Sequence, residues 1–111
     1  MKPRTLTPEA REAALLNQLG RLLRGETTEG QVLRTLRREV LGLSQSDYAA
    51  LVGVSRRTLS DIERDAGSFS TASMNRVFRP LGLKVGLVPR QADLLARLGK
   101  AAEPRREVST R

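Results

Sequence analysis

Five hydroxyl residues divide this sequence into short segments, and this division restricts the chain to a fold of small packed helices. Each hydroxyl precedes a stretch whose apolar residues recur every three or four positions, as they do on one face of a helix. Each can accept a hydrogen bond from a free N–H group of a first helical turn, and a glycine stands where each stretch ends. The predicted helices begin after Thr7, Thr28, Ser44, Ser55 and either Ser70 or Thr71, and they end at or before Gly25, Gly42, Gly53, Gly67 and Gly82.

The segment after Gly82 has a different period. Leu83, Val85 and Leu87 stand at every second position, which is typical of a β-strand, and Pro89 ends the pattern. A last short helix is predicted within residues 91–98, followed by a polar, charged tail. The predicted fold class is therefore all-α, with five to six short helices and one short C-terminal β-strand.

The third and fourth predicted helices are joined by the tight turn Gly53-Val54-Ser55, which is the geometry of a helix-turn-helix motif. Ala49 is small where the two helices must approach closely, and Gly53 permits a positive φ at the turn. Leu59 and Ile62 are spaced to hold the second helix of the motif against the core.

The residue types of this motif and the spacing between them resemble those of the XRE/Cro-type repressor family over about residues 32–81. The resemblance implies a lambda-repressor-like fold and sequence-specific binding of double-stranded DNA, with the second helix of the motif lying in the major groove. The segments that carry it are Leu43-Ser44-Gln45, Ala49, Gly53-Val54-Ser55, Leu59 and Ile62-Glu63-Arg64.

Four regions are predicted along the chain. Residues 1–27 form an N-terminal helical extension and residues 28–82 the helix-turn-helix domain. Residues 83–89 form a dimerisation strand, and residues 90–111 a short helix with a basic, flexible tail.

The resemblance also assigns the DNA-contacting positions. Arg56 and Arg57 are the first candidates, because a guanidinium group donates two parallel hydrogen bonds to guanine or phosphate. The alternative is an ordinary solvated polar face on a small helix. The predicted DNA-binding residues are Gln45, Ser55, Arg56, Arg57, Thr58, Ser60 and Arg64.

Two further positions are expected to have a structural role. Members of the family often pair an arginine before the motif with a glutamate near the end of its second helix, which here implies an ion pair between Arg38 and Glu63. The competing interpretation places Arg38 on a phosphate and leaves Glu63 exposed. Asp61 is expected to orient Arg57, four residues earlier, more readily than to approach phosphate.

A finer resemblance is to HipB-like antitoxins, in which a single strand follows the motif. It implies a homodimer on a palindromic operator and a protein toxin as a second partner. The alternatives are an XRE-type regulator without a toxin, and a protein-interaction module whose leucine stripes neutralise a partner. The residues predicted to pair across the dimer are Leu83, Lys84, Val85, Leu87 and Val88.

Composition narrows the remaining choices. The chain carries 20 basic and 12 acidic residues, a net charge of +8, which favours an anionic partner. It has neither cysteine nor histidine, so we expect no enzyme, no metal and no cofactor; a metal-dependent nuclease built on Asp61, Glu63 and Asp65 is a weaker alternative. No apolar run approaches the roughly 20 residues that span a bilayer, and we expect a cytoplasmic protein with no membrane partner.

Overall fold

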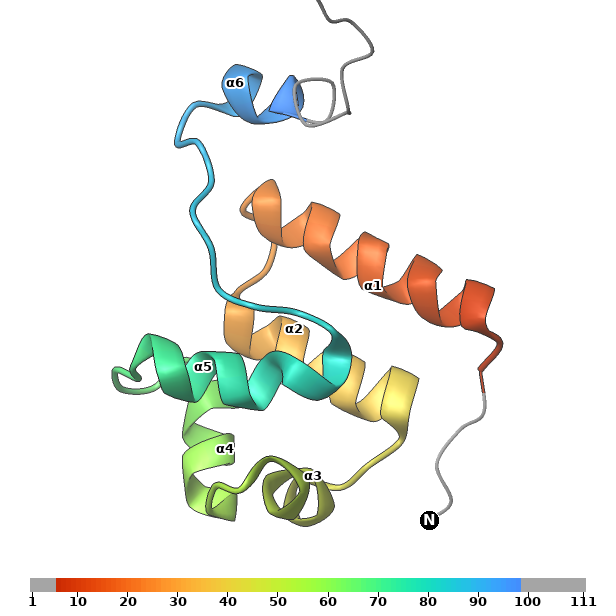
Figure 1. Cartoon of the computed structure of the whole chain (residues 1–111), viewed down its shortest axis with the longest axis vertical. Helices are drawn as coiled ribbons and strands as arrows, with labels where there is room; N and C mark the ends of the chain where they lie inside the picture. The colour runs from red at the N-terminus through yellow and green to blue at the C-terminus, as the bar shows by residue number, and fades with distance from the viewer. Residues whose placement is uncertain (1–5, 99–111) are drawn as a thin grey trace, which may run out of the picture.

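The computed structural model of the chain describes residues 6–98, and within this range its regular elements are all helices, without a β-strand (Figure 1). The prediction of five to six short helices is confirmed for these residues. The elements are α1 (Pro8–Leu23), α2 (Glu29–Leu36), η1 (Arg37–Leu41), α3 (Gln45–Val52), α4 (Arg56–Glu63), α5 (Thr71–Phe78), η2 (Arg79–Leu81) and α6 (Ala92–Ala96).

The predicted hydroxyl caps explain where five of the helices begin. In each case the side-chain oxygen accepts a hydrogen bond, 3.0–3.2 Å long, from the backbone N–H three residues further on. Such a cap stabilises a helix by about 1 kcal/mol, because it satisfies one of the free donors of the first turn. The capping residues are Thr7, Thr28, Ser44, Ser55 and Ser70.

The core lies among α2, α3, α4 and α5. Tyr48 of α3 is fully buried, and its hydroxyl donates a hydrogen bond to the Val77 carbonyl of α5. This bond satisfies the one polar atom that the ring carries into the core. The buried apolar residues are Val32, Leu33, Leu36, Val40, Tyr48, Ala49, Val52, Leu59, Ile62, Val77, Phe78 and Leu81.

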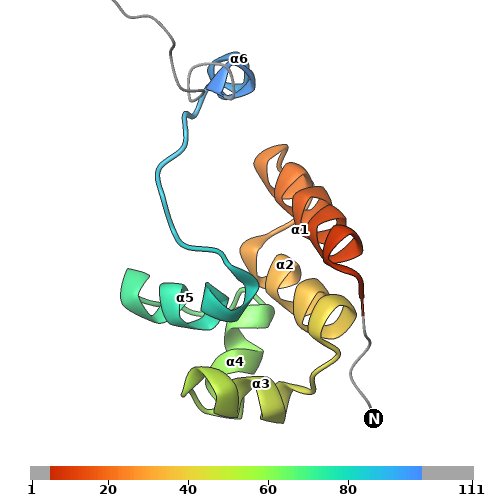
Figure 2. The ribbon, with the colours of Figure 1, turned by 45° about the vertical axis from the view of Figure 1, so that its right-hand side comes forward.

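Helix α1 lies along α2 on the side away from α3 and α4 (Figure 2). Leu15 and Leu22 contact the core from this helix, whereas Leu16 and Leu23 remain exposed. The leucine-rich face of α1 is therefore only partly used within one chain.

Gly30 marks the closest approach between α2 and the end of α4. A Cβ atom at this position would lie 2.4 Å from the Ile62 carbonyl oxygen and 2.8 Å from that of Glu63. Asp65, which follows α4, accepts hydrogen bonds from the Gly30 N–H at 3.0 Å and the Thr28 hydroxyl at 2.6 Å. The start of α2 is thus fastened to the end of α4.

The segment after η2 differs from its prediction. Residues 83–89 run extended but form no strand, because a strand needs a partner and none lies beside them in the described chain. Val85 donates its N–H to the Asn75 side chain at 2.7 Å, and Leu87 is 102% exposed. Figure 1 shows this segment leaving the helical body, with α6 standing apart beyond the end of α1. Residues 99–111, predicted to be a flexible tail, lie outside the described range.

Candidate nucleic-acid interface

Helices α3 and α4 meet at the tight turn that the sequence predicts. Gly53 ends α3 with φ 77° in the left-handed region, which favours glycine. The N–H groups of Gly53 and Val54 both donate to the Ala49 carbonyl, at 2.9 and 3.0 Å. Ser55 then caps α4, whose Leu59 and Ile62 are buried. One side of α4 is therefore fixed against the core.

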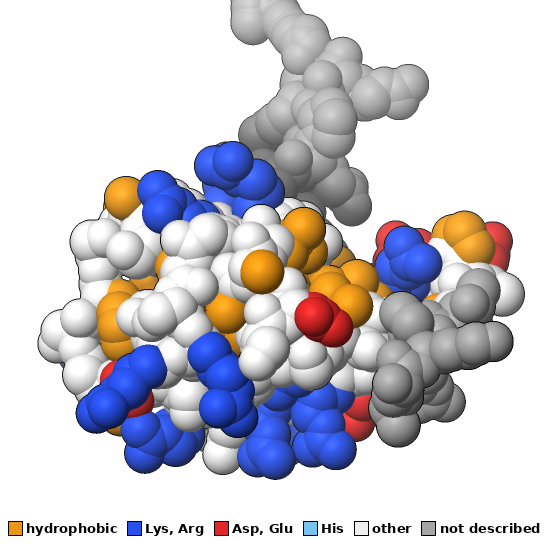
Figure 3. Space-filling model, turned by 90° about the horizontal axis from the view of Figure 1, so that it is seen from below, with side chains coloured by type: hydrophobic (Ala, Val, Ile, Leu, Met, Phe, Trp, Pro, Cys, Tyr) orange, Lys and Arg blue, Asp and Glu red, His pale blue; other side chains and the backbone are white. Residues whose placement is uncertain are grey.

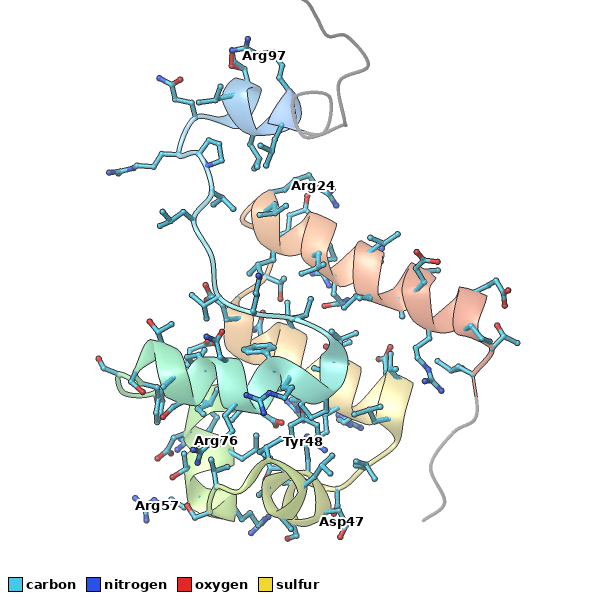
Figure 4. All side chains as sticks on the ribbon, in the orientation of Figure 1. Arg24, Asp47, Tyr48, Arg57, Arg76 and Arg97 are labelled. Atoms are coloured by element: carbon cyan, nitrogen blue, oxygen red, sulfur yellow. The ribbon has the colours of Figure 1, made fainter. Side chains whose placement is uncertain are left out.

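The opposite side of α4 is polar and open to solvent. The Arg57 side chain is 89% exposed and projects from the end of the molecule (Figure 4). Ser60 is half-buried, and the surface here forms a shallow hollow lined by Arg56, Arg57, Ser60, Asp61 and Arg64. Four of the predicted DNA-binding residues thus share one surface of α4.

Asp61 is the single carboxylate in this hollow, and arginines surround it. Its Oδ1 accepts a hydrogen bond from Arg64 Nη2 at 2.5 Å, and its Oδ2 lies 4.0 Å from Arg57 Nε. All three side chains are partly or largely exposed, so these pairs contribute little to stability. They orient the arginines while leaving them free to exchange partners.

Ser55 and Thr58 are placed differently from the arginines. The Ser55 oxygen caps the Thr58 N–H at 3.0 Å, and the two hydroxyls lie 2.9 Å apart. Both hydroxyls are thus engaged at the start of α4, where they hold the first turn that carries Arg56 and Arg57.

Glu63 forms the predicted ion pair with a different arginine. Arg37, not Arg38, donates to both of its oxygens, from Nε at 2.6 Å and Nη2 at 3.0 Å. Residue 37 lies on the same buried face of the helix as Leu33 and Leu36. Residue 38, one position further along, lies outside this face and is exposed. The expected pairing of Arg38 with Glu63 is therefore wrong by one residue.

The Arg37–Glu63 pair is buried and fully hydrogen-bonded. Its side chains are 7% and 2% exposed, and the third Arg37 nitrogen donates to the Leu43 carbonyl at 2.7 Å. Gln45 Nε2 donates to Glu63 Oε1 at 2.9 Å, so the first residue of α3 is tied to the last residue of α4. The pKa of nearby Tyr48 is raised, first by burial and then by the Glu63 charge. The pair fixes the angle at which α4 is presented.

The acidic residues that a metal site would need are each engaged elsewhere. Asp61 contacts Arg64, Glu63 contacts Arg37, and Asp65 caps the start of α2. No group of three metal-ligating side chains occurs among residues 6–98. Glu63 and Asp65 thus join α4 and its end to other helices, while Asp61 contacts arginines on the outer side of α4.

Sequence reasoning missed Arg37, Gly30 and Asp65. The position of Arg37, four residues after Leu33 in an apolar stripe, was a signal that its side chain points inward. The Gly30–Asp65 contact joins residues that are 35 positions apart, so no local sequence pattern predicts it.

The end of the molecule that carries α3 and α4 is rich in basic side chains. Figure 3 looks onto this end and shows Lys and Arg around much of its margin, most of them along the lower edge of the view, with fewer acidic side chains among them. The predicted dimerisation residues are not part of this face: Leu83 is half-buried near the core, while Lys84, Val85, Leu87 and Val88 are exposed on the segment that leads away from it.

One comparison with known proteins, that with family models, agrees with this geometry. A family model described as Helix-turn-helix matches residues 33–87, which hold the second half of α2 and everything from η1 to η2. The comparison with curated proteins found no match, and neither did that with solved structures. No helix within residues 6–98 is long and apolar enough to cross a membrane. Residues 33–87, just under half of the chain, therefore match a helix-turn-helix domain of the XRE type.

Proposed function

We propose that the protein is a sequence-specific transcriptional repressor that binds a palindromic DNA operator as a two-fold dimer. The observation that carries the proposal is the division of α4 into two sides. Leu59, Ile62 and Glu63 are buried, whereas the arginines at both ends of the helix are exposed. A helix held this rigidly, with a basic outer side, is suited to the major groove.

Arg56 and Arg57 have the principal role in reading bases. They occupy the first turn of α4, the part of a recognition helix that lies nearest the base edges. Each can donate a bidentate pair of hydrogen bonds to guanine O6 and N7. Arg64, at the C-terminal end, exchanges Asp61 for a base or phosphate when DNA binds.

Gln45 fixes the orientation of α4 on the DNA. It begins α3, and the free N–H groups of that first turn are available to a phosphate oxygen. Because Gln45 also donates to Glu63, a phosphate contact here sets the position of α4 in the groove.

The dimer is formed by residues 83–88. Val85, Leu87 and Val88 are 46%, 102% and 53% exposed, which leaves a run of apolar side chains without cover in one chain. Antiparallel pairing with the same segment of a second chain would satisfy the free backbone groups and cover these side chains. The two α4 helices would then face half-sites about 34 Å apart.

Selection from a library of random duplexes tests this function directly. We expect enrichment of an inverted repeat. The selected duplex should give a mobility shift, and scrambled DNA should compete poorly for the protein. Retention of all duplexes alike would reduce the proposal to non-specific binding, and no retention at low salt would refute it.

A second candidate role is that of an antitoxin that also represses its own operon. It is favoured by a largely apolar groove of about 510 Å³ between the end of α1, α5 and residues 83–90. Two exposed leucines, Leu94 in α6 and Leu98 just after it, add apolar surface. The test is co-expression with the product of the adjacent reading frame. Relief of growth inhibition by this chain, but not by a Leu94→Asp, Leu98→Asp variant of equal stability, would support the role; no inhibition to relieve would exclude it.

A further inference from the structure

Two exposed arginines, Arg34 and Arg38, stand beside the recognition helix α4 without a described partner. They are one turn apart, so they lie on the same side of the continuous helix formed by α2 and η1. With Gln45, Ser60 and Arg64 they border a hollow of about 450 Å³, which the buried Arg37–Glu63 pair also lines. We name this feature the α2–α4 hollow.

The charges around the α2–α4 hollow are unbalanced. Four arginines and a single carboxylate line it, and that carboxylate is already bound by Arg37 and Gln45. Within residues 6–98, neither Arg34 nor Arg38 forms an ion pair or a side-chain hydrogen bond. The acidic Glu39 lies near them in an adjoining hollow but beyond ion-pair distance. Two like charges one turn apart repel, and no interaction within the described chain offsets this.

The α2–α4 hollow is continuous with the outer surface of α4. Ser60 and Arg64 line both this hollow and the one that contains Arg56 and Arg57. If α4 lies in a major groove, one of the two flanking phosphate strands must pass beside it, since the groove is only about 12 Å wide. The hollow is the surface that this strand would meet.

We infer that Arg34 and Arg38 bind the phosphate backbone of the duplex whose major groove holds α4. The inference rests on the proposed DNA-binding function and extends it to a second helix. Guanidinium groups donate to phosphate oxygens in pairs, and such contacts set register and affinity without reading sequence. The two arginines therefore contribute to binding of operator and unrelated DNA alike.

The salt dependence of DNA affinity separates this role from base reading. Each lost phosphate contact makes the slope of log K against log salt shallower by about 0.9, equivalent to about a tenfold loss of affinity at 0.1 M salt. In the Arg34→Gln, Arg38→Gln double variant the slope should become shallower by roughly twice that amount, because two contacts are lost. The change should be the same on the selected operator and on a scrambled duplex of equal length. Arg34→Lys, Arg38→Lys should retain most of the slope, because it keeps the charge.

A matched control removes the same charge elsewhere. Arg11 and Arg79 are also exposed, and they lie on α1 and η2, near the separate hollow formed with Pro80 and Leu81. Arg11→Gln, Arg79→Gln should change the slope much less. Thermal melts should show that both double variants fold as the wild type does, since all four side chains are exposed.

The outcomes distinguish this inference from the proposed function. If the Arg34, Arg38 variant keeps the wild-type slope while Arg57→Ala loses affinity, DNA binding stands and the phosphate role of α2 is wrong. If the variant loses operator affinity alone, or if the control changes the slope equally, the role is also wrong. A wild-type protein that binds no DNA overturns the proposed function itself.

Discussion

The helix-turn-helix body and the segment that follows it differ in how their apolar side chains are covered. In residues 28–82 every α-helix begins at a hydroxyl cap and packs an apolar side into one core, so the body is complete within a single chain. In residues 83–98 the apolar side chains of Leu87, Leu94 and Leu98 face solvent. The contrast shows where the molecule is self-sufficient and where it is suited to a partner.

The largest expected effect is the loss of the buried ion pair in the body. Glu63→Ala leaves Arg37 charged and buried, and should destabilise the fold by about 3–5 kcal/mol. Thermal or urea unfolding measures this. Glu39→Ala, which removes an exposed carboxylate from η1, is the control and should change stability little. Equal melting temperatures for the two variants would contradict the structural role of Glu63.

Leu87→Asp tests whether the exposed segment requires a second chain. Leu87 is fully exposed in one chain, so the change should not alter the stability of the body. In a two-fold dimer it removes two buried leucines, a loss of about 3 kcal/mol or more, and places like charges together. Sedimentation should show a monomer with weakened operator binding.

Asn75→Ala is the control for that experiment, because it removes the bond to the Val85 N–H without altering the apolar residues. A Leu87→Asp protein that still sediments as a stable dimer would exclude residues 83–88 as the dimer contact. It would leave the face of α1 as the next candidate.

Gly30→Ala should cost about 1–3 kcal/mol of stability, because the added methyl group meets the backbone carbonyls of Ile62 and Glu63. Gly86→Ala, in the exposed segment, is the matched substitution, since a Cβ there meets nothing within 4 Å. Comparable unfolding curves for these two variants would contradict the close contact between α2 and α4.

The difference between local and long-range interactions explains which features could be predicted from the sequence. Helix starts in the body depend on local chemistry, and the caps at Ser44 and Ser55 placed both helices of the motif correctly. The partner of Glu63 depends on how η1 is turned about its axis, and the expected arginine was wrong by one position. The alternation at 83–88 describes a strand whose pairing one chain cannot provide, so its dimer role stays a prediction.

The role of α4 as the recognition helix is tested most directly by the affinity of Arg57→Ala for the selected operator and for a scrambled duplex at the same salt concentration. A base contact by Arg57 predicts a loss of about 1–3 kcal/mol on the operator and a smaller loss on the scrambled duplex. The melting temperature should not change, because this side chain is 89% exposed. Arg76→Ala, on α5, serves as the charge-matched control. Operator binding as tight as that of the wild type would contradict the assignment of α4 as the recognition helix.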